Sequence, residues 1–94
     1  MGTEILDEVF AVIEDRRDNP KKESYVSGLL AKGGEAVIDK IEEEADEFME
    51  AGRGSDKKAI VHEAADLIFH AMVLLAAKGV KLDDIMKEFK RRRR

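Results

Sequence analysis

The eighteen residues from Ile60 to Ala77 constrain the fold of this chain more than any other stretch. Fourteen of them are apolar, and the four polar ones are His62, Glu63, Asp66 and His70. At the helical rotation of about 100° per residue, these four side chains fall within about 100° of the circumference of an α-helix. A helix that is apolar around the rest of its surface must be buried on most sides. Its polar strip therefore faces either water or a site inside the protein.

The stretch from Glu35 to Ala51 predicts a second amphipathic helix, which is much more acidic. Its apolar residues lie on one face at helical spacing. They are Val37, Ile38, Ile41, Ala45, Phe48 and Met49. Lys40, Glu44 and Glu47 follow one flank of this face, whereas Glu43 lies further round towards solvent. Glu44 is the carboxylate nearest the apolar face.

The two helices carry pairs of carboxylates with the same spacing. Glu44 and Glu47 are three residues apart, as are Glu63 and Asp66, so each pair lies on one side of its helix. If the helices pack together, the four carboxylates converge, and in a partly buried site they repel one another. A divalent cation neutralises such a cluster. An all-oxygen ligand set suits Mg²⁺, which commonly keeps waters and substrate phosphates in its shell, so we predict a Mg²⁺ site.

The other segments of the chain also predict helices. The predicted helices are Glu4–Arg17, Tyr25–Lys32, Glu35–Ala51, Asp56–Lys78 and a last one with Leu82, Ile85, Met86 and Phe89 on one face. Residues placed to cap or end them are Thr3, Ser24 and Ser55 at the amino ends and Gly33, Gly34 and Gly79 at the carboxyl ends. Residues 18–23 hold the only proline and predict a loop. No segment alternates with period two, so we predict an all-α fold of five helices in a single domain over residues 1–94.

The two long helices form an antiparallel hairpin, because only a short turn around Gly52-Arg53-Gly54 joins them. The second of them is apolar around too much of its circumference for four other elements, three of them short, to cover it. A second copy of the chain would cover it. Two hairpins would then pair into a four-helix bundle with carboxylates facing inward, so we expect a homodimer or a higher homo-oligomer.

Composition narrows the classes of protein that fit. Cysteine is absent, which excludes disulfides and thiolate–zinc sites and suits the reducing cytosol. No signal-peptide pattern is found, and the longest strongly apolar run, Leu67–Ala77, is far shorter than the about 20 residues of a membrane span. The net charge is −4, with −5 in residues 40–66, which argues against a nucleic-acid binder. We expect a cytoplasmic protein whose basic tail, Arg91–Arg94, is a solvated helix end, with contacts to an anionic ligand or a partner subunit as the alternative.

Four segments together resemble one enzyme family. They are Ser24-Tyr25-Val26, Lys40-Ile41-Glu42-Glu43-Glu44-Ala45-Asp46-Glu47, Glu63-Ala64-Ala65-Asp66-Leu67-Ile68-Phe69-His70 and Val73-Leu74-Leu75-Ala76. Over nearly its whole length the chain resembles phosphoribosyl-ATP pyrophosphohydrolase. This family belongs to the all-α nucleoside triphosphate pyrophosphohydrolases, with the MazG-like and dimeric dUTPase branches, which are marked by Glu-Glu-x-x-Glu and Glu-x-x-Asp motifs that bind Mg²⁺. The chain departs from the family pattern at Glu42, where a small residue is frequent, and at the bulky Phe48-Met49.

The resemblance implies Mg²⁺-dependent hydrolysis of phosphoribosyl-ATP to phosphoribosyl-AMP and pyrophosphate, the second step of histidine biosynthesis. By matching position, it implies metal ligation by Glu44, Glu47, Glu63 and Asp66. Glu43 and Glu47 are the candidate catalytic residues, with Glu43 either orienting water as a base or supporting a ligand. The candidate contacts of the nucleotide substrate are Lys40, Ser24, Tyr25, Arg17 and His70.

Two other functions stay open on the sequence. A MazG-like housekeeping nucleoside triphosphate pyrophosphohydrolase would share the metal site and differ in its substrate pocket. A non-catalytic helical dimerisation module would be indifferent to Mg²⁺ and would have no reason for acid on so apolar a helix. Single residues have structural interpretations as well. Tyr25 fits a core aromatic, Arg17 a surface charge, and His70 a hydrogen-bonded core histidine.

Overall fold

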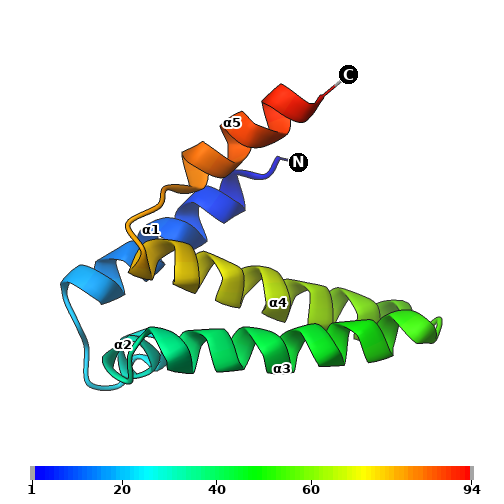
Figure 1. Cartoon of the computed structure of the whole chain (residues 1–94), viewed down its shortest axis with the longest axis horizontal. Coiled ribbons are helices and arrows are strands. Elements are labelled where there is room, and N and C mark those ends of the chain that lie inside the picture. The colour runs from blue at the N-terminus through cyan, green and yellow to red at the C-terminus, as the bar shows by residue number, and fades with distance from the viewer. Residues whose placement is uncertain (1, 94) are drawn as a thin grey trace.

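The computed structural model describes residues 2–93 and contains five α-helices and no strand within that range. The helices are α1 (Glu4–Asp18), α2 (Tyr25–Ala31), α3 (Gly34–Arg53), α4 (Lys57–Ala77) and α5 (Leu82–Arg92). The all-α prediction and the predicted order of helices are confirmed. α3 and α4 lie side by side as a long antiparallel hairpin, and α2 lies where α3 begins (Figure 1).

The core lies at the α2 end of the hairpin, where α1 crosses the carboxyl-terminal half of α4 (Figure 1). Its largest fully buried side chains are Ile13 of α1, Val37 of α3 and Val73 of α4. Phe10, Val26, Leu29, Met72, Ala76 and Leu82 complete it. The amino-terminal half of α4, which carries the acidic strip, therefore has α3 beside it and less covering elsewhere.

The helix ends follow the predicted capping chemistry, with one correction. Ser24 caps α2 as predicted, because its hydroxyl oxygen accepts a backbone N–H of the first turn at 3.1 Å. The prediction of Ser55 as the cap of α4 is wrong. The next residue, Asp56, takes that place, and its carboxylate accepts the backbone N–H groups of Lys58 and Ala59. A carboxylate also interacts favourably with the positive end of the helix dipole.

Other predicted ends are approximately right. Gly79 follows α4 with a φ of 71°, the left-handed backbone that suits a glycine after a helix. Thr3 stands at the N-cap of α1, but its side chain makes no capping hydrogen bond. α3 continues through Gly52 to Arg53, two residues beyond its predicted end. One helical glycine costs only about 1 kcal/mol, which packing against α4 can offset.

α5 leaves the hairpin beside α1 (Figure 1). It is held at its start by buried Leu82 and by Lys81, whose ammonium donates to the Glu14 carboxylate at 3.0 Å. Its apolar residues Met86 and Phe89 are exposed. At the far end two arginines of the basic tail pair with Glu88, and Arg94 lies outside the described residues.

Within residues 2–93, α4 is the one helix long and apolar enough to cross a membrane, judged by length and composition alone. Core helices of soluble proteins meet the same criterion. The strip of His62, Glu63, Asp66 and His70 would place four polar side chains in the span, which is costly in a lipid environment. We therefore interpret α4 as the second helix of the α3–α4 hairpin and not as a membrane span.

Candidate metal centre

One turn of α3 supplies the first half of the acidic site. Glu43, Glu44 and Glu47 each offer a carboxylate oxygen, and the three oxygens lie within 4.8 Å of one another. Glu44 is only 4% exposed, Glu47 is half-buried and Glu43 is exposed. This order of burial confirms the prediction that Glu44 lies nearest the apolar face and Glu43 furthest from it.

Glu44 carries the most informative carboxylate of the site. Its Oε1 lies 3.4 Å from the Lys40 ammonium, whereas its buried Oε2 has no hydrogen-bond partner among residues 2–93. A buried carboxylate oxygen without a partner is costly, so this position fits a ligand from outside the chain. A hard divalent cation bound by carboxylate oxygens satisfies it, and the donor set is therefore of the right chemistry for Mg²⁺.

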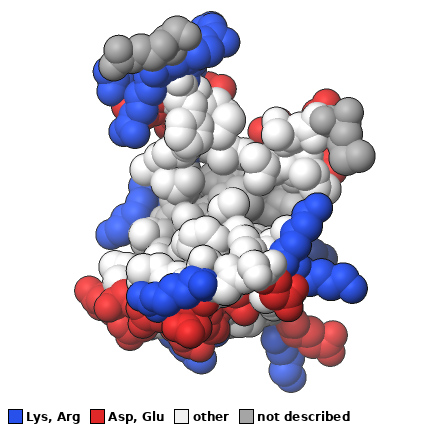
Figure 2. Space-filling model, turned by 90° about the vertical axis from the view of Figure 1, so that its right-hand side faces the viewer, with Lys and Arg blue, Asp and Glu red and all other residues white. Residues whose placement is uncertain are grey.

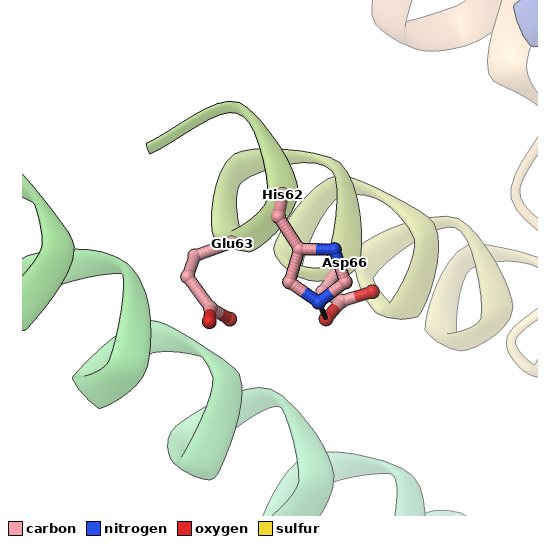
Figure 3. Close-up of side chains that lie close together, drawn as sticks. All are labelled: His62, Glu63 and Asp66. Carbon is pink, nitrogen blue, oxygen red and sulfur yellow. Dashed lines mark ion pairs between the residues drawn. The ribbon is translucent and has the colours of Figure 1, made fainter. Parts of the chain in front are cut away.

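The first turns of α4 supply the second half of the site. His62, Glu63 and Asp66 also offer ligand atoms within 4.8 Å of one another. Figure 3 shows the Glu63 carboxylate extending towards α3, while the His62 ring lies against Asp66. The Nε2 atom of His62 is 3.3 Å from Oδ2 of Asp66. Sequence reasoning placed His62 on the polar strip but gave it no role, although its four-residue spacing from Asp66 indicates this contact.

The two halves act on each other electrostatically. The carboxylate of Glu44 raises the pKa of Glu47 above its ordinary value, and partial burial, Glu63 and Glu43 raise it further. Glu63 belongs to the opposite helix, so its contribution indicates that it lies near Glu47. The ligand atoms form two separate groups among residues 2–93, one on each helix, so binding of one ion by all four carboxylates stays a prediction.

Lys40 supplies a positively charged side chain at this site. Its ammonium lies 3.4 Å from Glu44 and 3.5 Å from Glu43. Burial by itself would lower the pKa of Lys40, but these two carboxylates more than offset that effect and raise it. Lys40 therefore stays charged beside a cluster that still carries a net negative charge.

Tyr25 of α2 and His70 of α4 contact each other at the α2 end of the site. The Tyr25 hydroxyl lies 2.8 Å from Nε2 of His70, and Nδ1 of His70 lies 2.7 Å from the backbone carbonyl oxygen of Asp66. Both ring nitrogens thus have partners within the chain. Burial raises the pKa of the Tyr25 hydroxyl, with smaller raising effects from Glu44, Glu43 and Asp66 and an opposing effect from Lys40.

Arg17 and Ser24 lie apart from the carboxylates. The Ser24 side chain caps α2 and so sets the position of Tyr25 in the first helical turn. Arg17 donates to the Asp18 carboxylate and, at 2.8 Å, to the backbone carbonyl of Ala76. Ala76 lies ten residues beyond Asp66, about 15 Å along α4. Arg17 instead borders a separate hollow of about 460 Å³.

Known proteins match this chain over nearly its full length. The family model described as phosphoribosyl-ATP pyrophosphohydrolase matches residues 6–93. Phosphoribosyl-ATP pyrophosphatase of Methanocella arvoryzae is 50% identical over 93 residues, which cover 97% of this chain and 98% of the relative. The same-named proteins of Methanococcoides burtonii and Clostridium botulinum are 45% and 40% identical, covering 95% of this chain and 92% and 81% of their own lengths.

Proposed function

This chain belongs to the phosphoribosyl-ATP pyrophosphohydrolase family, and from that premise we propose how the acidic site on α3 and α4 works. The reaction is the hydrolysis of phosphoribosyl-ATP to phosphoribosyl-AMP and pyrophosphate in histidine biosynthesis. It breaks the anhydride bond between the α- and β-phosphates. Such a reaction requires neutralisation of phosphate charge and a positioned water more than covalent chemistry.

We propose that Mg²⁺ is held by two carboxylates from each helix of the hairpin. The ligands are Glu44 and Glu47 of α3 and Glu63 and Asp66 of α4. The single observation that supports this most strongly is the buried Oε2 of Glu44, which has no partner among residues 2–93. When bound, Mg²⁺ supplies positive charge that neutralises the leaving pyrophosphate.

Side chains of the protein carry out the remaining steps of the reaction. The oxygen of a water attacks the α-phosphorus, the bond to the bridging oxygen of the β-phosphate breaks, and the water gives up a proton. Glu43 is the acceptor that we propose, because it is the exposed carboxylate of the α3 cluster and water reaches it directly. Glu47, which is also a proposed ligand, orients the same water. Lys40 lies 3.5 Å from Glu43 and 3.4 Å from Glu44, and we propose that it binds the phosphates.

We further propose that two copies of the chain pair through α4. Val61 and Ile68 are 58% and 51% exposed in the single chain. A hollow of about 420 Å³ adjoins Ile68 and is lined mainly by apolar side chains of α1 and α4. Figure 2 shows this uncharged, hollowed face, with acidic side chains gathered along a different edge. In a soluble cytoplasmic dimer or higher oligomer, a second copy of the chain would cover this apolar face. A stable 10.6 kDa monomer in sedimentation would contradict the proposed pairing.

The decisive assay for this function is release of pyrophosphate from phosphoribosyl-ATP, compared with ATP and dUTP, with Mg²⁺ and with a chelator. We expect phosphoribosyl-ATP to be cleaved far better than the ordinary triphosphates, and only with Mg²⁺. Equal turnover of all three substrates would instead support the MazG-like housekeeping activity. Full activity in the chelator would contradict the proposed metal centre.

A further inference from the structure

A basic hollow lies at the loop that joins α1 to α2 (Figure 1). Its volume is about 380 Å³, and its lining residues are Arg16, Lys21, Lys22, Glu23 and Ser24. Arg16 is half-buried near the end of α1, whereas both lysines are exposed. The three cations outnumber the nearby carboxylates, which are Glu23 and the Asp15 that pairs with Arg16. The hollow therefore attracts anions.

A buried serine fixes the backbone around this hollow. The hydroxyl of Ser27, a residue that is 8% exposed, donates to the backbone carbonyl of Arg16 at 3.0 Å. The oxygen of the same hydroxyl accepts the backbone N–H of Lys21, also at 3.0 Å. The backbone N–H of Ser24 in turn donates to the carbonyl of Lys21 at 3.0 Å. The loop is thus held in place before any ligand binds, which lowers the cost of ordering it on binding.

Donor groups remain free around the hollow. Among residues 2–93, no ion pair involves Lys21 or Lys22. The Ser24 oxygen accepts the backbone N–H of Ser27, and no acceptor for its own proton is found within that range. A phosphate monoester has three acceptor oxygens and a negative charge. Ammonium, guanidinium and hydroxyl donors around one hollow match such a group.

Tyr25 connects this hollow to the acidic site. It follows Ser24, which lines the hollow, and its hydroxyl lies 2.8 Å from Nε2 of His70 on α4. Besides burial, the charges of Lys40 and Glu44 act on the pKa of this hydroxyl, so they lie nearby. One aromatic residue therefore separates the basic hollow from the proposed metal ligands.

The substrate named for this family carries phosphate at two ends. In phosphoribosyl-ATP, one ribose bears the triphosphate, and a second ribose, attached to the other side of the adenine, bears a phosphate monoester. ATP carries only the first of these groups. A ligand with phosphate at both ends can therefore reach the metal ligands and the basic hollow together, whereas ATP has no group for the hollow.

We propose that the basic hollow binds the phosphate monoester of the second ribose through Arg16, Lys21 and Lys22. The inference rests on the proposed function for the identity of the substrate. It assigns these three residues to the selection of phosphoribosyl-ATP over ordinary triphosphates and not to the chemical step, because specificity is a difference between two affinities.

Kinetics with two matched substrates test this assignment. Ribosyl-ATP, which is phosphoribosyl-ATP without its monoester phosphate, is compared with the full substrate. Lys21→Gln/Lys22→Gln removes both lysine charges, and Arg16→Gln removes the guanidinium. We expect each variant to raise KM for phosphoribosyl-ATP at least about tenfold and to leave kcat nearly unchanged, because hydrogen bonds to a charged group are lost. For ribosyl-ATP, KM should change by less than about twofold.

Lys87→Gln/Lys90→Gln is the matched control, because it removes two lysine charges from α5. We expect it to change KM for neither substrate. Melting temperatures control for folding, and if Arg16→Gln is destabilised, the exposed lysine pair decides. Equal losses with both substrates would show only a general attraction of polyanions and would overturn the proposal. An unchanged KM for phosphoribosyl-ATP in the folded lysine variant would overturn it as well.

Backbone amide NMR tests the site without turnover. The protein in chelator is titrated with ribose 5-phosphate and, as the reference, with ribose. We expect the signals of residues 21–24 to shift with ribose 5-phosphate only, and the shifts to disappear in Lys21→Gln/Lys22→Gln. Shifts at Gly33, Gly34 and Lys78 instead would place the phosphate in the separate hollow beside Arg17 and would overturn the proposal. Weak shifts spread over exposed lysines, the sign of an adventitious ion only, would overturn it too.

The two experiments also distinguish this inference from the function on which it rests. If the expected amide shifts are present and phosphoribosyl-ATP is not hydrolysed, the proposed function fails and the phosphate site stands. If phosphoribosyl-ATP is hydrolysed in preference to ATP and the amide shifts are absent, the proposed function stands and this inference fails.

Discussion

Carboxylates occupy two contrasting environments in this chain, the outer helices α1 and α5 and the acidic site on α3 and α4. On α5 the guanidinium groups of Arg91 and Arg92 hold the pKa of Glu88 below its ordinary value. On α1 Arg17 does the same for Asp18. In the acidic site, one oxygen of Glu44 has no partner within residues 2–93, and the neighbouring Glu47 has a raised pKa.

The difference between these regions is local and does not follow from composition. The chain has 17 basic residues against 21 acidic ones, which would suffice to pair most carboxylates. Ion pairs of this kind occur on the outer helices, whereas in the acidic site Lys40 contacts two carboxylates and one oxygen of Glu44 has no partner within residues 2–93. A buried carboxylate oxygen without a partner, beside a carboxylate with a raised pKa, is typical of a site that awaits a positive ligand.

The largest expected effect comes from removing one negative charge from the acidic site. Asp66→Asn keeps the shape of the side chain and removes a proposed ligand. We expect pyrophosphate release to fall at least about a hundredfold, because even residues that only support metal ligands cost 10–100-fold. The metal-free variant should be as stable as the wild type or more stable, because repulsion is relieved. Pyrophosphate release and denaturant unfolding in a chelator measure both quantities.

Glu88→Gln is the matched control for Asp66→Asn, because it removes one carboxylate from the other environment. We expect it to leave activity unchanged and to lower stability slightly, since its two arginines lose their partner. If Asp66→Asn unfolds or dissociates the protein, Asp66 is structural. Full activity of Asp66→Asn would remove this residue from the site.

The next effect in size is stabilisation by the metal itself. Binding to the folded state alone adds about 2.7 kcal/mol to the free energy of unfolding at a hundredfold excess over Kd. In a domain of this size each kcal/mol corresponds to about 4–8 °C in Tm. We expect Mg²⁺ to raise the Tm of the wild type and of Glu88→Gln equally, and that of Asp66→Asn much less. An equal rise in all three would show that Mg²⁺ binds elsewhere.

Much of this comparison could be predicted from the sequence, because it depends on helical periodicity. The position of Glu44 next to the apolar face of α3 predicted its burial, and the polar strip of α4 predicted that Glu63 and Asp66 lie close together. Both are properties of a single helix. The pairing of α3 with α4 follows from the apolar faces of two amphipathic helices joined by a short turn.

What the sequence did not reveal depends on angles between elements or on the choice between neighbouring residues. The hydrogen bond between Tyr25 and His70 requires a particular placement of α2 against α4. The bond from Arg17 to the end of α4 requires a particular crossing of α1. Ser55 and Asp56 can each cap a helix, and only the register of the first turn decides between them.

The smallest expected effect, and the most direct test of the comparison, is the opposite pH dependence of two glutamates. The folded-state pKa of Glu47 lies above 4.5, so the folded state binds its proton more tightly and its ionised form destabilises the metal-free protein. That destabilisation is fully present above the folded pKa and disappears as pH falls towards 4.5. The pKa of Glu88 lies below 4.5, so its stabilisation is present above 4.5 and is lost as pH falls through the lower folded value.

In chelator, Glu47→Gln should therefore exceed the wild type in stability at about pH 7 and lose that advantage by about pH 4. Glu88→Gln should be less stable than the wild type at about pH 7 and approach it only in stronger acid. Denaturant unfolding across this range measures both differences. If both variants are more stable than the wild type, or both less stable, the carboxylates of the acidic site and of the outer helices do not differ in the way that their contacts indicate.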